Sequence, residues 1–154
     1  QMYQVQNLFQ YSKPLSILPF SADGDETQSY VKYLVDGTAP NRVLVVEWVH
    51  QNYSWDGGQL CTSQALLYEG SNVIEFRYGA GGISSPYSNN VAIVGADAHN
   101  YLNIRPGPVA SNTDTNPLNV WPGAGVSFTF TPPAPCTTPK PGNTLADIAA
   151  MCPG

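Results

Sequence analysis

Two glutamates in strand-like runs are the residues of this chain with the clearest catalytic potential: Glu47 in VLVVEWV and Glu75 in NVIEFRY. On neighbouring strands they would supply the carboxylate pair that glycoside hydrolysis needs. Each also has a simpler partner, because Arg77 or Arg42 can pair across strands with Glu47, and Arg77 with Glu75. We favour the ion-pair interpretation, with Glu47 pointing out of the sandwich, since nothing in the sequence indicates a raised pKa.

Other catalytic and metal-binding patterns are missing from the sequence. His50 and His99 stand alone, and no Cys or His cluster has the spacing of zinc ligands. There is no G-x-S-x-G, H-E-x-x-H or P-loop motif. The acidic run from Asp23 to Glu26 lacks the ligand spacing of an EF-hand loop and indicates a surface turn. We therefore expect a protein that is not an enzyme, with no cofactor and no metal site.

The three cysteines are expected to play two different roles. Cys136 and Cys152 flank a proline-rich segment and could close a local disulfide loop in an oxidising compartment. Cys61 is then left over, either as a buried inert thiol or as one end of an intermolecular bridge. We favour burial, because its neighbours Leu60 and Ala65 are apolar and fit a core.

A polar, aromatic loop, HQNYSWDGGQ, carries the candidate ligand-binding residues Tyr53 and Trp55. Flat amphipathic rings on a glycine-containing loop suit stacking on sugars or anchoring a protein partner. A long hairpin loop also uses such rings to fold back over its own sheet, and this alternative is equally open. Tyr87 and Trp121 are further candidates for stacking on a sugar.

Strands must position these side chains, because side-chain character alternates with period two along much of the chain. Between Val43 and Val49 both faces are apolar, which predicts a central strand covered from two sides. We expect Trp48, Ile74, Phe76 and Tyr78 to form the centre of the core. The region 105–124 is predicted to be loop. The expected strands are 29–35, 43–49, 64–69, 72–78, one in VAIVGA, one in NYLNI and 126–131.

The chain divides into an N-terminal arm (residues 1–14), a β-sandwich domain (15–132) and a proline-rich tail (133–154). Apolar residues alternate with polar ones in the arm. The arm is therefore either a first strand that packs on the same domain or a strand that adds to the edge of a neighbouring sheet. The residues proposed for this assembly role are Tyr3, Val5, Leu8 and Phe9.

Composition indicates an extracellular β protein. Only 11% of the 154 residues are charged, whereas Gly and Pro number 14 each and Tyr 9. The net charge is −5 and the six cations are scattered singly, so nucleic acid is not an expected partner. No apolar run approaches the roughly 20 residues of a membrane helix, so membrane insertion is not expected.

Four segments carry a family resemblance: GTAPNRVLVVEW, ALLYEGSNVIEFRYG, VAIVGADAHNYLNI and FTFTPPAPC. In order and spacing they resemble the nidogen-like β-sandwich modules of large secreted bacterial surface proteins, which precede immunoglobulin-like or fibronectin-type-III arrays. The resemblance covers roughly residues 15–135 and implies an antiparallel, jelly-roll-like β-sandwich. Such modules usually have more strands before ILPFSADGD, so the sandwich is expected to be strand-incomplete. The tail ending in CPG resembles the start of an immunoglobulin-like unit.

The resemblance and the composition together favour a non-catalytic structural or adhesive module, located outside the cell or on its surface. Its sharper form is a self-assembling fibre subunit linked by edge-strand pairing, with other copies or other surface proteins as partners. The alternative function is a carbohydrate-binding module that contacts a polysaccharide through Tyr53 and Trp55.

Overall fold

The computed structural model describes residues 15–21, 29–51, 60–82, 90–95, 100–113 and 118–134. Within these ranges the secondary structure is entirely β, so the predicted all-β class is confirmed. The strands are β1 (Ser16–Ser21), β2 (Tyr30–Asp36), β3 (Val43–Gln51), β4 (Cys61–Tyr68), β5 (Ile74–Tyr78), β6 (Asn90–Val94), β7 (Tyr101–Arg105), β8 (Val109–Ser111) and β9 (Ser127–Phe130). No helix in the described ranges is long and apolar enough to cross a membrane.

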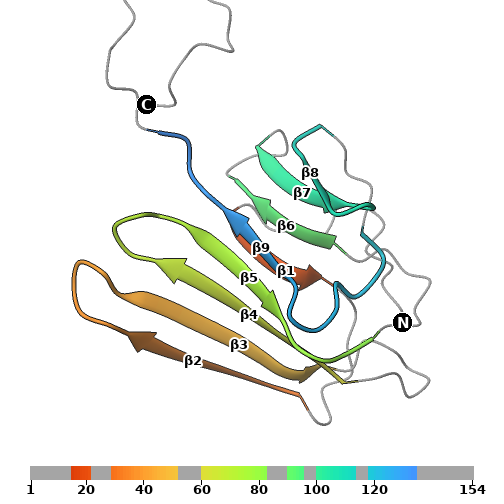
Figure 1. Cartoon of the computed structure of the whole chain (residues 1–154), viewed down its shortest axis with the longest axis horizontal. Coiled ribbons are helices and arrows are strands. Elements are labelled where there is room, and N and C mark those ends of the chain that lie inside the picture. The colour runs from red at the N-terminus through yellow and green to blue at the C-terminus, as the bar shows by residue number, and fades with distance from the viewer. Residues whose placement is uncertain are drawn as a thin grey trace, which may run out of the picture.

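The strands form two packed antiparallel sheets, which confirms the predicted β-sandwich (Figure 1). The large sheet has the order β2-β3-β4-β5-β9, and the small sheet has the order β1-β6-β7-β8. Across the interface β1 contacts β4. The strands of the small sheet therefore lie toward the β4–β5–β9 side of the large sheet, while β2 and β3 form the opposite margin (Figure 1).

The alternation of side chains sets the two faces of the large sheet as predicted. In β5, Phe76 and Tyr78 are buried between the sheets, and Arg77 between them is exposed. The turn before β5 is made at Gly70, which has a positive φ of 79°. A Cβ added there would meet the Pro40 carbonyl oxygen at 3.0 Å, so both the backbone angle and the space favour glycine.

Aromatic rings join the two sheets at the core. The Tyr78 and Trp121 rings meet edge-on with centroids 5.3 Å apart, and Phe20 of β1 packs on Trp121 at 5.1 Å. The Tyr78 hydroxyl donates a hydrogen bond to the Pro19 carbonyl oxygen of β1 (2.5 Å). Phe76 is fully buried, and Trp48 and Ile74 pack around this cluster while partly buried. The predicted core centre is therefore confirmed, and Trp121 belongs to it as well.

Two expectations about strands were wrong. The region 105–124, predicted as loop, contains the short strand β8. The strand at 43–49 was expected to be covered from both sides, but in β3 only Val49 is buried, and Val43 to Trp48 are half-buried. The reason lies in the packing, because the small sheet covers the β4 side of the large sheet and leaves much of β3 outside the interface.

Candidate functional site

Strand β2 is the most exposed element that the structure describes. It forms one edge of the large sheet, pairs with β3 alone, and all seven of its residues are exposed. Five of the seven carry large apolar or aromatic side chains. Their exposed fractions are Tyr30 52%, Val31 56%, Tyr33 78%, Leu34 54% and Val35 58%. We call this strand, with its free edge, the β2 edge.

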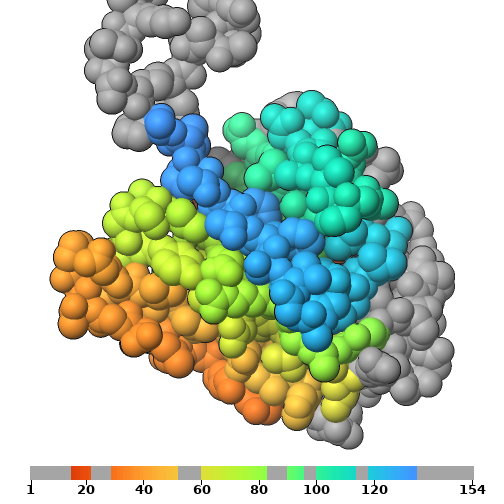
Figure 2. All heavy atoms as spheres, in the orientation of Figure 1, coloured from red at the N-terminus to blue at the C-terminus, as the bar shows by residue number. Residues whose placement is uncertain are grey.

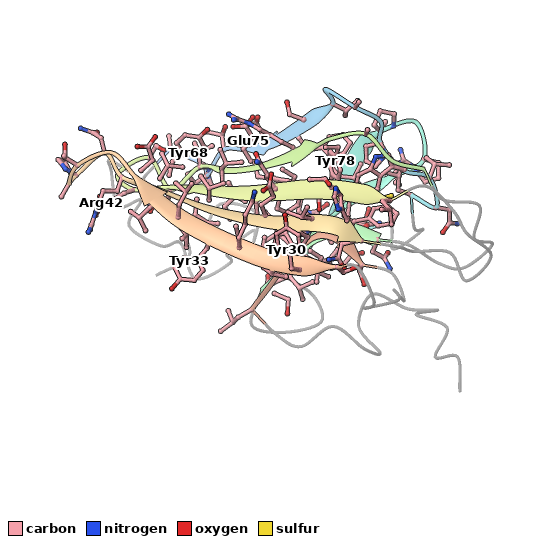
Figure 3. All side chains as sticks on the ribbon, turned by 90° about the horizontal axis from the view of Figure 1, so that it is seen from below. Tyr30, Tyr33, Arg42, Tyr68, Glu75 and Tyr78 are labelled. Carbon is pink, nitrogen blue, oxygen red and sulfur yellow. The ribbon has the colours of Figure 1, made fainter. Side chains whose placement is uncertain are left out.

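Three of the seven β2 side chains, Val31, Tyr33 and Val35, lie on the core-facing side of the sheet without being covered. The register pairs Tyr33 with Val46, Val46 with Ala65, and Ala65 with Phe76, so these four residues form one row across the sheet. Phe76 ends this row in the core, whereas Tyr33 ends it in solvent. Figure 3 shows Tyr33 projecting from one face of the sheet, with Tyr68 and Glu75 projecting from the other.

A groove continues this uncovered face. It has a volume of about 460 Å³ and lies where the two hairpin ends, β2–β3 and β4–β5, come together. Its floor includes Val35, Leu44, Leu67 and Ile74, which form the next row of the core-facing side. The β2 edge and the groove thus belong to one apolar surface at the margin of the sheet.

The opposite face of the large sheet carries several charged and polar side chains, and Glu47 is one of them. Glu47 accepts a hydrogen bond from Gln64 Nε2 (2.7 Å) and pairs with Lys32 Nζ of β2 (2.6 Å). The Lys32 ammonium holds the pKa of Glu47 below its usual value. The prediction that Glu47 points outward is confirmed, but its predicted arginine partner is wrong. Gln64 of β4 stands between Glu47 and Arg77, so the neighbouring cation is Lys32.

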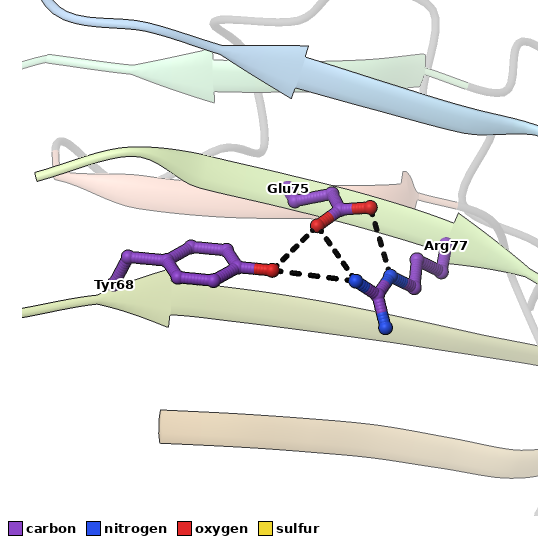
Figure 4. Close-up of polar contacts among 3 residues, drawn as sticks. All are labelled: Tyr68, Glu75 and Arg77. Carbon is purple, nitrogen blue, oxygen red and sulfur yellow. Dashed lines mark hydrogen bonds and ion pairs between the residues drawn. The ribbon is translucent and has the colours of Figure 1, made fainter. Parts of the chain in front are cut away.

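Glu75 forms a closed network with Tyr68 and Arg77 (Figure 4). Arg77 donates two hydrogen bonds to its carboxylate, at 2.8 and 3.0 Å, and the Tyr68 hydroxyl donates a third at 2.7 Å. Arg77 lowers the pKa of Glu75, and Glu75 in turn raises the pKa of Tyr68. The predicted Glu75–Arg77 pair is present, although along one strand rather than between strands.

These contacts weigh against Glu47 and Glu75 as a hydrolytic pair. They lie on β3 and β5, with β4 between them, and not on neighbouring strands as the sequence suggested. Both carboxyl groups have lowered pKa values, whereas a general acid needs a raised one. The two side chains instead stabilise the outer face of the sheet.

Cys61 is buried, as predicted. It is fully inaccessible, and its thiol lies 3.6 Å from the Gly82 carbonyl oxygen. Burial raises its pKa to about 11, so the reactive thiolate is scarce at neutral pH. Of the neighbours used for this prediction, Ala65 is buried but Leu60 is 37% exposed. The core position of Cys61 therefore follows from its place at the start of β4.

A protein-family model described as NIDO related matches residues 2–132. The chain belongs to the NIDO-related family. Neither the curated proteins nor the solved structures include a match to it. Membership in the family agrees with the nidogen-like resemblance of the strand segments and supports a structural module of the extracellular type.

Several predicted site residues of this NIDO-related protein lie outside the described ranges. They are the arm residues Tyr3, Val5, Leu8 and Phe9, the ligand candidates Tyr53, Trp55 and Tyr87, the acidic run 23–26, His99, and the disulfide candidates Cys136 and Cys152. Trp121 is described, and it is a core residue whose indole N–H donates to the Gly79 carbonyl oxygen (3.1 Å), so it offers no face to a sugar. Among the described residues no group of three or more potential ligands gathers around a metal position.

Sequence reasoning missed the β2 edge as a site in the NIDO-related chain. The run SYVKYLV was recognised as a strand, but its exposure depends on where the small sheet lies. One signal was available in the sequence. Apolar residues occupy both faces of this strand, and Lys32 is its only cation. The strand therefore has little of the charge that usually keeps a sheet edge from pairing with another chain.

Proposed function

We propose that this NIDO-related protein is a non-catalytic, extracellular structural module that joins other protein chains by strand addition at the β2 edge. The observation that carries the proposal is the exposure of all seven residues of a regular, largely apolar edge strand. In strand addition, backbone hydrogen bonds supply affinity, and side chains that alternate between the two faces supply selectivity.

The other sheet edges support the choice of β2. β8 and β9, at the far edges of the two sheets, have three and four residues. The register of β1 is interrupted between Leu18 and Ser21, whereas the seven pairs from Tyr30 to Asp36 run without a break. Short and irregular edges resist pairing with another chain. β2 therefore offers the longest regular template among the described edges.

The paired charges on the outer face of the large sheet support a structural rather than a catalytic role. Glu47 and Glu75 are both ion-paired and hydrogen-bonded within the sheet. Such ion pairs stabilise a sheet modestly, and the lowered pKa values of the two glutamates keep them ionised at neutral pH. In this interpretation, the outer face contributes solubility and the β2 edge contributes attachment.

The experiment replaces exposed apolar residues of β2 by lysine. The double variant Tyr33→Lys/Val35→Lys should keep the fold, because both side chains are mostly in solvent, and should abolish association measured by sedimentation velocity. The matched control is Val109→Lys, which places a lysine on the β8 edge of the small sheet. Association that is unchanged in the double variant would refute strand addition at β2, whereas a wild-type protein that stays monomeric at every concentration would refute only pairing between copies.

The fibre form of this proposal needs a second contact, for which the arm is the candidate. Deleting residues 1–12 should leave the circular dichroism spectrum of the sandwich unchanged. It should abolish those assemblies that need a second contact in addition to the one at β2. Electron microscopy of the full-length and shortened chains would distinguish filaments from small particles. Filaments that persist after the deletion would remove the assembly role of the arm.

A further inference from the structure

We infer that the partner of the β2 edge is the β2 edge of a second copy of this chain, paired antiparallel about a two-fold axis at Tyr33. This inference rests on the proposed function, since it specifies which chain is added at β2 and in which register. The two large sheets would become one continuous sheet with β2 next to β2 at its centre. The argument comes from the self-complementarity of the seven residues.

The symmetry limits the possible registers. An axis that relates two antiparallel edge strands stands normal to the sheet, so the core-facing sides of both copies stay on the same side. Residues directly opposite each other in an antiparallel pair also share a face. The axis must therefore pass through a residue position. Of the positions in β2, only Tyr33 lets all seven residues pair, because it is the middle residue of 30–36.

The side chains fit this register. Tyr33 lies opposite Tyr33 of the second copy, and Val31 lies opposite Val35 on the same core-facing side. Aromatic and β-branched pairs of this kind are favourable cross-strand contacts. Val31, Tyr33 and Val35 are all more than half exposed in the single chain, so the pairing removes apolar surface from water where the fold leaves it uncovered.

The number of pairs rather than the charges selects Tyr33 over Leu34, since an axis at Leu34 would put Lys32 opposite Asp36 but would leave only five pairs. In the register centred on Tyr33, Lys32 lies opposite Leu34 of the second copy, with Asp36, the only acidic residue of β2, at one diagonal position and the second Lys32 at the other. Moving the axis to Lys32 would place two ammonium groups directly opposite each other and leave only five pairs, and like charges in that position are destabilising. Within one copy Lys32 is already neutralised by Glu47, so the dimer buries no isolated cation.

Space around the β2 edge permits the contact. None of the described residues covers β2, whose side chains are exposed along the whole strand. In Figure 2 the residues of β2 and β3, in orange, form the margin of the molecule away from β7 and β8 in teal. A two-fold contact of this kind uses the same surface on both copies and is closed, so it yields dimers. A seven-residue contact lies at the small end of interfaces, below about 1,200 Å², and suits weak association.

Cysteine cross-linking of the full chain tests the register. A disulfide needs Cα atoms about 4.4 to 6.8 Å apart, and directly opposite residues of antiparallel strands meet this condition. Tyr33→Cys should therefore give a covalent dimer on mild oxidation at high protein concentration. Val31→Cys and Val35→Cys should each give little dimer alone, because the two identical cysteines of such a dimer lie four residues apart along the paired strands. An equal mixture of the two variants should cross-link, because residue 31 of one chain lies opposite residue 35 of the other. The wild-type chain, oxidised in parallel, reports the background from its native cysteines.

The outcomes separate this inference from the proposed function. Suppose that sedimentation shows association that depends on β2, but that Lys32→Cys or Leu34→Cys cross-links better than Tyr33→Cys. This outcome would overturn the register and leave the proposed function in place. Complexes larger than a dimer that still depend on β2 would overturn the closed two-fold contact. Strong protection from hydrogen exchange of the β2 amides that point away from β3, in a chain that sediments as a monomer, would mean that another segment of the chain already occupies the edge, and it would overturn pairing with a second copy.

Discussion

The two halves of the large sheet share one pattern of alternating side chains but differ in how far these side chains are exposed to solvent. Along a single row, the exposed fraction is 78% at Tyr33, 2% at Ala65 and 0% at Phe76. All three residues lie on the core-facing side, and the backbone pairing along this row connects β2 to β5. The difference comes from the small sheet, which covers β4 and β5 and not β2. Alternation therefore defines a face of the sheet, while coverage depends on the second layer.

The largest expected effect contrasts the two ends of this row. Phe76→Ala should lower the free energy of unfolding by about 3–5 kcal/mol, because it leaves a cavity in a packed core. Tyr33→Ala, in the same row, should change it by less than about 0.5 kcal/mol. Urea unfolding of both variants measures the contrast. Similar losses at the two positions would mean that Tyr33 is covered in solution.

The middle of the row should give an intermediate value. Val46 is half-buried in β3, and Val46→Ala removes two methyl groups from a site that packing covers only in part. We expect a loss of roughly 1 kcal/mol, between the values for the two ends of the row. The same urea series supplies the measurement. A loss as large as that of Phe76→Ala would show that the core-facing side of β3 is fully covered.

A hydroxyl deletion sharpens the comparison without changing packing. Tyr78→Phe removes the buried hydrogen bond to the Pro19 carbonyl oxygen, which links the two sheets, and should cost about 1–2 kcal/mol. Tyr33→Phe is the matched control, because the Tyr33 side chain is mostly in solvent and the substitution there should be close to neutral. Thermal unfolding of the pair is sufficient, and equal melting temperatures would argue against the link between the sheets.

The smallest expected effect concerns an exposed ion pair at the hairpin ends. Arg42 donates to Glu69 through Nε at 2.8 Å and lowers the pKa of Glu69 to about 2. Since the folded-state pKa is depressed, the stabilisation is present above the unfolded pKa of about 4.5 and is lost as the pH falls through about 2. The pair is exposed, so the effect on stability should be small.

A carboxyl titration by NMR checks this ion pair directly. Glu69 should titrate near its ordinary value in Arg42→Gln and well below it in the wild-type chain. Lys32→Gln is a suitable control, because it removes a different cation of the same sheet and should leave the Glu69 titration in place. An unchanged midpoint in Arg42→Gln would contradict the assigned partner.

Much of the sheet could be predicted from local patterns. β2, β3 and β5 were placed to within two residues at each end, because alternating β-branched and aromatic residues specify both a strand and its faces. β8 was missed, since its three residues lie among prolines and glycines with no alternation to detect. The partner of Glu47 was also wrong. It depends on which strand borders β3, and a sequence pattern does not contain that order.

The sequence by itself determined most of the strands, the side of the sheet on which their residues lie, and four residues at the centre of the core, which are Trp48, Ile74, Phe76 and Tyr78. These properties follow from period-two alternation, which depends only on neighbouring residues and is the same however the sheets pack. Only the tertiary structure decided that β2 is an uncovered edge, that Glu47 pairs with Lys32, and that Trp121 belongs to the core. Each of these depends on contacts between segments far apart in the chain, where strand order and the position of the second sheet set the neighbours.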